Sequence, residues 1–83
     1  MDIELVKIFL DLTKTLHFGR TSQNCCMTPA TLTRIIQKME TTLGSPLFHR
    51  DNRTVEITTT GQIFKHYCED QLTNWTALQE EIG

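Results

Sequence analysis

The sequence has 83 residues, of which 39% are hydrophobic and 22% charged, with a formal net charge of −2 at pH 7. A chain of this length forms one small domain at most and buries only about 60 to 65% of the surface that its unfolded form exposes, so we expect a partner chain to add to its stability. No apolar run approaches the roughly 18 residues of a membrane span, and acidic residues stand where a signal peptide has its basic leader, which predicts no membrane partner and no targeting segment.

The first predicted helix is capped by Asp2 and runs to about Thr15. At about 100° per residue its apolar side chains cover well over half of the circumference, and only the strip with Glu4 and Lys7 is polar. A helix with so broad an apolar surface is expected to pack against two partners. Its apolar positions are Ile3, Leu5, Val6, Ile8, Phe9, Leu10, Leu12 and Leu16.

A short helix of about seven residues is predicted next, with a buried side formed by Phe18, Ser22 and either Cys25 or Cys26. The three cysteines are odd in number, and the adjacent pair is poorly suited to a mutual disulfide. This usage favours a reduced protein in the cytoplasm, in which the cysteines act as small core residues.

The third predicted helix has a well-defined start and end. Thr28 is a good N-cap, and Pro29 suits the first helical position, where its missing N–H would be unpaired anyway. Gly44 is expected just past the last turn. The apolar residues between recur at helical spacing and predict the buried face. That face contains Leu32, Ile35, Ile36, Met39 and Leu43.

The segment "LFHRDNRTVEIT" predicts a two-stranded hairpin over about residues 47–58. Val55 and Ile57 alternate with polar residues, which is the period of a strand, and "RDNR" supplies a basic turn. We therefore expect a hairpin whose tip is flanked by Arg50 and Arg53.

The last predicted helix is capped by Thr59 or Thr60 and runs to the end of the chain. About 22 residues give roughly 33 Å, which is more than so small a core can cover. We infer a coiled-coil-like homodimer seam in which the polar Gln71 sets the register. The proposed seam contains Phe64, Tyr67, Cys68, Gln71, Trp75, Leu78 and Ile82.

These elements, a helix-turn-helix followed by a basic hairpin and a long helix, resemble the N-terminal region of the LysR-type bacterial transcription regulators over the whole chain. The matching stretches are "FLDLTKTLHFGR", "TPATLTRIIQKMETTLGSPLFHR" and "VEITTTG". The resemblance implies a mostly α, winged helix-turn-helix DNA-binding domain over residues 1–59, with the helix-turn-helix at about 18–37 and the wing at about 47–58, and a linker helix for dimerisation over 60–83. It also implies an effector-binding domain, and a small-molecule effector, outside this chain.

The chain departs from the family pattern at two places. Thr21, Ser22, Asn24 and Cys25 stand where members often have alanines, so packing of the second helix is less typical. Pro29 stands where members often have a glutamine that contacts a base, so that contact cannot be carried over.

The middle of the chain is basic although the whole is acidic. Residues 16–55 contain five Lys or Arg and two Asp or Glu, a balance of +3, whereas residues 61–83 have a balance of −3. A cationic face of this kind suits a polyanion. With the resemblance, it predicts binding to double-stranded DNA. The recognition helix would contribute Thr28, Pro29, Ala30, Thr31, Thr33, Arg34, Gln37 and Lys38, and the wing and backbone contacts would come from Arg20, Arg50, Asn52, Arg53 and Thr54.

Other functions fit the sequence less well. The cysteines lack C-x-x-C spacing and the histidines lie in different elements, so we expect no metal site and no cofactor in this chain. His66 and Cys68 project to different faces of a helix, which argues against a nucleophile and base, and no other arrangement predicts catalysis. The rival hypothesis is a helical protein-interaction module. The favoured one is a dimer on an inverted-repeat site, with a tetramer conceivable for the full-length protein.

Overall fold

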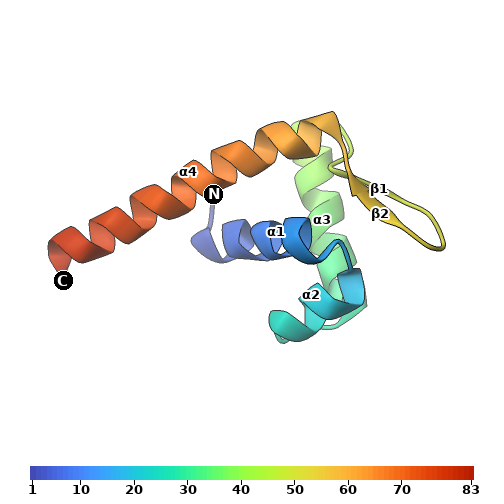
Figure 1. Ribbon diagram of the computed structural model, residues 1–83, viewed down its shortest axis with the longest axis horizontal. Coiled ribbons are helices and arrows are strands. Elements are labelled where there is room, and N and C mark those ends of the chain that lie inside the picture. The colour runs from blue at the N-terminus through green and yellow to red at the C-terminus, as the bar shows by residue number, and fades with distance from the viewer.

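The computed structural model describes residues 1–83 and contains four helices and one two-stranded antiparallel sheet. In chain order the elements are α1 (Ile3–Thr15), α2 (Phe18–Asn24), α3 (Pro29–Leu43), β1 (Phe48–Arg50), β2 (Val55–Ile57) and α4 (Thr59–Ile82). Figure 1 shows α1 beside the long α4, with α3 crossing behind and the hairpin projecting on the side away from the C-terminus. This arrangement confirms the predicted winged helix-turn-helix followed by a long helix. None of the helices combines the length and hydropathy of a membrane-spanning segment.

Helix α1 lies in the middle of the core because its apolar surface serves two neighbours. It packs against both α4 and α2, which confirms the two partners expected from its sequence. Asp2 caps the helix as predicted, since its Oδ1 accepts a hydrogen bond from the Glu4 N–H at 2.8 Å. Leu16 does not extend the apolar surface as expected. It is the C-cap with a positive φ of 49° and is exposed, because the helix ends one residue earlier.

The turn between α2 and α3 places the adjacent cysteines differently from each other. Cys25 is partly buried and packs against the core, whereas Cys26 is exposed and adopts a positive φ of 56°. The prediction that Cys25 or Cys26 joins the buried side is thus confirmed by Cys25, whereas the expectation of a core role is wrong for Cys26. Its backbone makes the reversal between the two helices, and that conformation turns its side chain outward.

Helix α3 begins and ends as predicted. Thr28 is the N-cap, and Gly44 is the C-cap with a positive φ of 76°, its N–H donating to the Glu40 carbonyl at 2.8 Å. The predicted buried face is correct for its central turns. Leu43, however, is 44% exposed because the last turn of α3 extends past the core. The side chains facing inward are Leu32, Ile36 and Met39, with Ile35 partly buried.

Hydrogen bonds join the wing to the start of α4. Phe48 pairs with Ile57, which places both strands within the predicted hairpin. The cap of α4 is Thr58, one residue before the predicted alternatives, and its Oγ1 accepts from the Gly61 N–H at 2.9 Å. The same hydroxyl donates to the Pro46 carbonyl at 2.6 Å. The hydroxyl thus joins the helix start to the segment that enters the wing.

The first half of α4 belongs to the core. Phe64 is 6% exposed, with its ring centroid 4.7 Å from that of Phe9, and Cys68 is fully buried. Both residues were expected in a dimer seam, and this expectation is wrong because α1 of the same chain covers them. Burial also raises the pKa of the Cys68 thiol to about 11. The predicted domain division after residue 59 stays a prediction, yet the core continues past it into α4.

Candidate nucleic-acid interface

The start of α3 is held by its own side chains. The Thr28 Oγ1 accepts from the Thr31 N–H at 3.1 Å, and Pro29 stands at the first helical position. The Thr28 hydroxyl in turn donates to the Thr31 Oγ1 at 3.0 Å. Because this end of the helix is exposed, its remaining free N–H groups point to solvent, and a helix N-terminus attracts anions.

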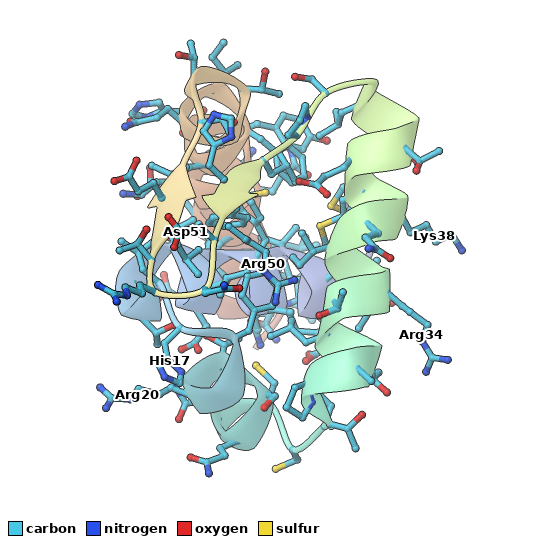
Figure 2. The ribbon with its side chains drawn as sticks, turned by 90° about the vertical axis from the view of Figure 1, so that its right-hand side faces the viewer. His17, Arg20, Arg34, Lys38, Arg50 and Asp51 are labelled. Atoms are coloured by element: carbon cyan, nitrogen blue, oxygen red, sulfur yellow. The ribbon has the colours of Figure 1, made fainter.

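The outer face of α3 carries most of the predicted recognition residues. Ala30, Arg34, Gln37 and Lys38 are exposed, and Thr31 and Thr33 are partly buried. Figure 2 shows Arg34 and Lys38 extending from α3 away from the body of the domain. The predicted exposed arc is therefore present, and its polar groups lie on one side of one helix.

The two threonines on this face are not free hydroxyls. Arg34 donates from Nη2 to the Thr31 Oγ1 at 3.3 Å, and Arg50 donates from Nη1 to the Thr33 Oγ1 at 3.3 Å. Spacing along the helix suggested Thr33 as a base contact but gave no sign of a partner from the wing. Gln37 and Lys38 remain the unengaged polar side chains of the central turns.

The wing tip is organised by one carboxylate. Oδ1 of Asp51 accepts hydrogen bonds from the Arg53 and Thr54 N–H groups, both at 2.8 Å. These bonds, together with one from the Thr54 hydroxyl, hold the pKa of Asp51 below its usual value. The turn chemistry expected from the sequence is therefore present, and it leaves the exposed side chains of Asn52 and Arg53 at the tip.

Arg50 flanks the tip as predicted, but its side chain turns away from the tip toward α2 and α3. It ends β1, and its guanidinium carbon lies 3.6 Å from the centroid of the Phe18 ring. Figure 2 shows it between the hairpin and α3. The direction of the side chain has a physical cause, since a cation is attracted to an aromatic face and the Phe18 ring lies within reach of Arg50.

Arg20 lies on the exposed side of α2, beside the N-cap of that helix. The cap is His17, whose Nδ1 accepts from the Arg20 N–H at 2.9 Å. Figure 2 places both residues at the same end of the domain, on the far side of the wing loop from the start of α4. The sequence predicted a helix entry here but not the histidine cap, because His is an uncommon residue at that position.

The basic residues of this surface have no acidic partners. Ion pairs within the chain join only Lys7 to Glu4 and His66 to Glu69, and both are exposed. None of the cations of the interface is neutralised by the protein itself. Five positive charges on α2, α3 and the wing are thus available to an anionic partner. They are Arg20, Arg34, Lys38, Arg50 and Arg53.

Two supporting groups were missed from the sequence. The Glu40 carboxylate on α3 accepts from the Leu47 N–H at 2.7 Å and so fixes the entry to the wing. The Asp11 carboxylate on α1 accepts from the buried Thr21 hydroxyl at 2.8 Å and from Asn24 at 3.1 Å, which ties α2 to α1. The polar residues in place of the family's alanines are therefore satisfied. A long-range bond of this kind leaves no signal in local spacing.

The second half of α4 carries the remaining seam residues. Tyr67, Trp75 and Leu78 are 47%, 38% and 45% exposed, and Ile82 is exposed as well, whereas Gln71 is partly buried. Figure 1 shows this end of α4 extending beyond the rest of the molecule. Met1, Ile3, Trp75 and Leu78 line a hollow where the N-terminus meets α4. An apolar surface is thus present, although shorter than predicted.

The sequence matches the family described as bacterial regulatory helix-turn-helix protein, lysR family, over residues 3–62. It is 40% identical over 82 residues to the HTH-type transcriptional regulator IlvY of Escherichia coli (strain K12) and 34% identical over 83 residues to the HTH-type transcriptional regulator HdfR of Salmonella newport (strain SL254). These matches cover 99% and 100% of this chain but only 28% and 30% of the relatives. The chain therefore belongs to the lysR family of bacterial regulatory helix-turn-helix proteins, and it spans less than a third of the length of those two relatives.

Comparison with a solved structure supports the same fold. The crystal structure of the BenM_DBD/catB site 1 DNA complex is similar with a TM-score of 0.89 and 26% sequence identity, covering 99% of this chain and 92% of that chain. The fold of the whole chain, long helix included, is therefore that of a winged helix-turn-helix domain of this family. The resemblance stated from the sequence is confirmed.

Proposed function

We propose that this chain binds double-stranded DNA sequence-specifically, with α3 in the major groove and the wing on the backbone or in the minor groove. The observation that carries the proposal is the capped, exposed α3 beside a hairpin with unpaired arginines. The similar BenM structure is a DNA complex, which supports the same partner here. Family membership supports it as well.

The side chains of α3 suit the edges of base pairs. Arg34 can grip guanine O6 and N7, and Gln37 can pair with adenine. Thr28 and the free N–H groups of the helix start suit a phosphate, as do Arg20 and Lys38. At the tip, Arg53 suits the narrow minor groove of A·T-rich DNA, where negative potential is concentrated. Pro29 contributes only apolar contact.

A homodimer through α4 would place two such surfaces on one duplex. At about 100° per residue Phe64, Gln71, Trp75, Leu78 and Ile82 fall within about 60° of one another, so a single apolar face runs the length of the helix. The core covers its first half, and we propose that a second chain covers the rest. A two-fold dimer would bind an inverted repeat with half-sites about one helical turn apart.

The biological role proposed for the whole protein is transcription regulation in the bacterial cytoplasm, without enzymatic activity. Its named relatives are transcriptional regulators, and the chain spans only part of their length. We propose that effector binding resides in a further domain of the full-length protein, which could also assemble as a tetramer.

The test is binding of a duplex selected from a random pool, measured against salt. Log K should fall by about 0.9 per phosphate neutralised for each unit of log salt. Arg34→Ala should weaken the selected duplex by roughly 1 to 3 kcal/mol and relax base choice at one position, whereas Arg53→Ala should weaken many different duplexes alike. Lys7→Ala, a cation of α1 paired with Glu4, is the matched control and should leave binding unchanged.

The alternative is a helical protein-interaction module, favoured by the exposed apolar end of α4. No salt-dependent DNA binding at low ionic strength, combined with retained self-association, would establish that alternative. Dimerisation is tested separately by analytical ultracentrifugation of the wild type and Leu78→Glu. A wild type that stays monomeric at high concentration would refute the proposed dimer.

A further inference from the structure

Arg50 is part of the wing, and its side chain contacts both α2 and α3. It ends β1, its guanidinium carbon lies 3.6 Å from the Phe18 ring centroid, and its Nη1 donates to the Thr33 Oγ1 at 3.3 Å. Phe18 is the first residue of α2, and Thr33 lies in the second turn of α3. Figure 2 shows the side chain in the space between hairpin and helix.

The ring under the guanidinium is fixed by the core. Phe18 is buried and meets Phe48 edge to face, with centroids 6.3 Å apart, and Phe48 in turn lies 5.6 Å from Phe9. A cation over an aromatic face is stabilised even at an exposed site, and a planar guanidinium can stack on the ring where a lysine ammonium cannot. Arg50 therefore rests on a rigid platform, although its own side chain is exposed.

The strands of the wing are anchored near their base, because Phe48 lies in the core and Val55 and Ile57 pack against it, whereas the loop beyond them has few contacts with the domain. Each strand has three residues, and an isolated two-stranded hairpin is marginal in water. At its base, Glu40 on α3 holds the Leu47 N–H. At its tip, Asp51 bonds only to Arg53 and Thr54 within the same turn. Arg50 stands between these points, where the paired strands end and the loop begins.

We propose that Arg50 is a positioning residue for DNA recognition, which fixes the angle of the wing to α3 so that Arg53 and Arg34 engage one duplex together. This inference rests on the proposed DNA binding and adds to it. A wing held in place before binding loses less conformational freedom when the complex forms. Because Arg50 donates to the Thr33 oxygen, the wing is joined directly to the face of α3 that carries Arg34.

The decisive variant is Arg50→Lys, which keeps the charge and loses the planar fork. It should weaken the selected duplex about three- to tenfold, because the guanidinium's stacking on Phe18 and its hydrogen bond to Thr33 are replaced by the weaker contact of an ammonium. Binding to an unrelated duplex and the salt slope should stay at wild-type values, because the charge is retained. The comparison variant is Arg53→Lys at the tip, a direct DNA contact in the proposed function, whose loss should be of similar size on the selected and the unrelated duplex. The matched control is Lys7→Arg on α1, outside the proposed interface, which should leave both affinities unchanged.

A second measurement does not depend on DNA. In the free protein, NMR order parameters of the Asn52, Arg53 and Thr54 amides should fall in Arg50→Lys and remain unchanged in Arg53→Lys. Phe18→Leu should produce the same fall, and combining it with Arg50→Lys should add little, because both remove one contact. If Phe18→Leu shows no folding transition in a thermal melt, the order parameters of Arg50→Lys and Arg53→Lys alone test the positioning role.

The outcomes separate this inference from the proposed function. Equal losses on both duplexes for Arg50→Lys would show a simple phosphate contact and overturn the positioning role, as would unchanged affinity with unchanged wing order. In either case wild-type binding remains. A wild type that binds neither duplex at low salt would overturn the proposed function and this inference together.

Discussion

Gly61 is the position where a single methyl group should do the most damage. The residue is buried in the first turn of α4, where the helix passes the entry to the wing. A Cβ added there would lie 2.3 Å from the Leu47 carbonyl oxygen and 2.6 Å from Cγ1 of Ile57. The Leu47 oxygen cannot withdraw freely, since it accepts the Thr58 N–H at 3.0 Å.

The expected cost of Gly61→Ala follows from two opposing terms. Overpacking against well-ordered atoms costs about 1 to 3 kcal/mol and sometimes more, and here one of the two close atoms is backbone. Alanine in place of glycine in a helix returns about 1 kcal/mol. We expect a net loss of about 2 kcal/mol, because the contact is too short for side-chain adjustment alone. For a domain of this size that loss lowers Tm by about 8 to 16 °C.

Calorimetry of purified Gly61→Ala measures this loss. The control is Gln62→Ala, an exposed neighbour in the same helical turn, which should stay within about 0.5 kcal/mol of the wild type. A Tm for Gly61→Ala at or above the wild-type value would show that α4 moves away from Leu47 without cost, and would refute the close packing inferred here.

Three further predictions concern the carboxylates and thiols. Glu40→Ala leaves the Leu47 N–H without its partner and should lower the free energy of unfolding in urea by about 1 to 3 kcal/mol. Glu56→Ala on the exposed side of β2 should leave that free energy unchanged, and equal effects of the two variants would contradict the role of Glu40. The pKa of Asp51 is lowered, so the stability that its carboxylate gives the wing turn is present above the ordinary pKa of 3.8 and is lost as pH falls through the lowered pKa. The Thr54 amide resonance should therefore stay constant from about pH 8 to 5, and a transition within that range would argue against this turn. Burial raises the pKa of Cys68 to about 11, so at pH 8 an alkylating reagent should label the exposed Cys26 first and Cys68 only on unfolding. Peptide mass spectrometry measures the two rates, and equal rates would show that α4 opens readily.

Local signals predicted the elements of this fold well. Thr28, Pro29 and Gly44 mark the bounds of α3 because capping and left-handed backbone depend on residues within one turn. The apolar breadth of α1 correctly indicated two packing partners. Such features need no knowledge of distant contacts, so sequence alone sufficed.

Features that depend on distant contacts were predicted less well. Phe64 and Cys68 share the helical face of Trp75, and nothing in their spacing shows that α1 covers the first half of that face only. Arg50 lies in a basic turn by sequence, but its side chain is placed by Phe18, which is 32 residues earlier in the chain. The sequence thus indicated which residues belong to the candidate interface, and the structure added the contacts between them.

For a polyanionic partner, the positions of the charges in the structure matter more than the net charge of the chain. A net charge of −2 argues against a polyanionic partner if the charges are averaged over the chain. The molecule is, however, 45 Å long, and Figure 1 shows the C-terminal end of α4, with Glu80 and Glu81, at the opposite end from the wing. Charges are screened over about 8 Å at physiological salt, so these acids do not offset the field at the wing and α3. A phosphate backbone approaching that face therefore meets the local balance of residues 16–58, in which five Lys or Arg stand against three Asp or Glu, and not the total of −2.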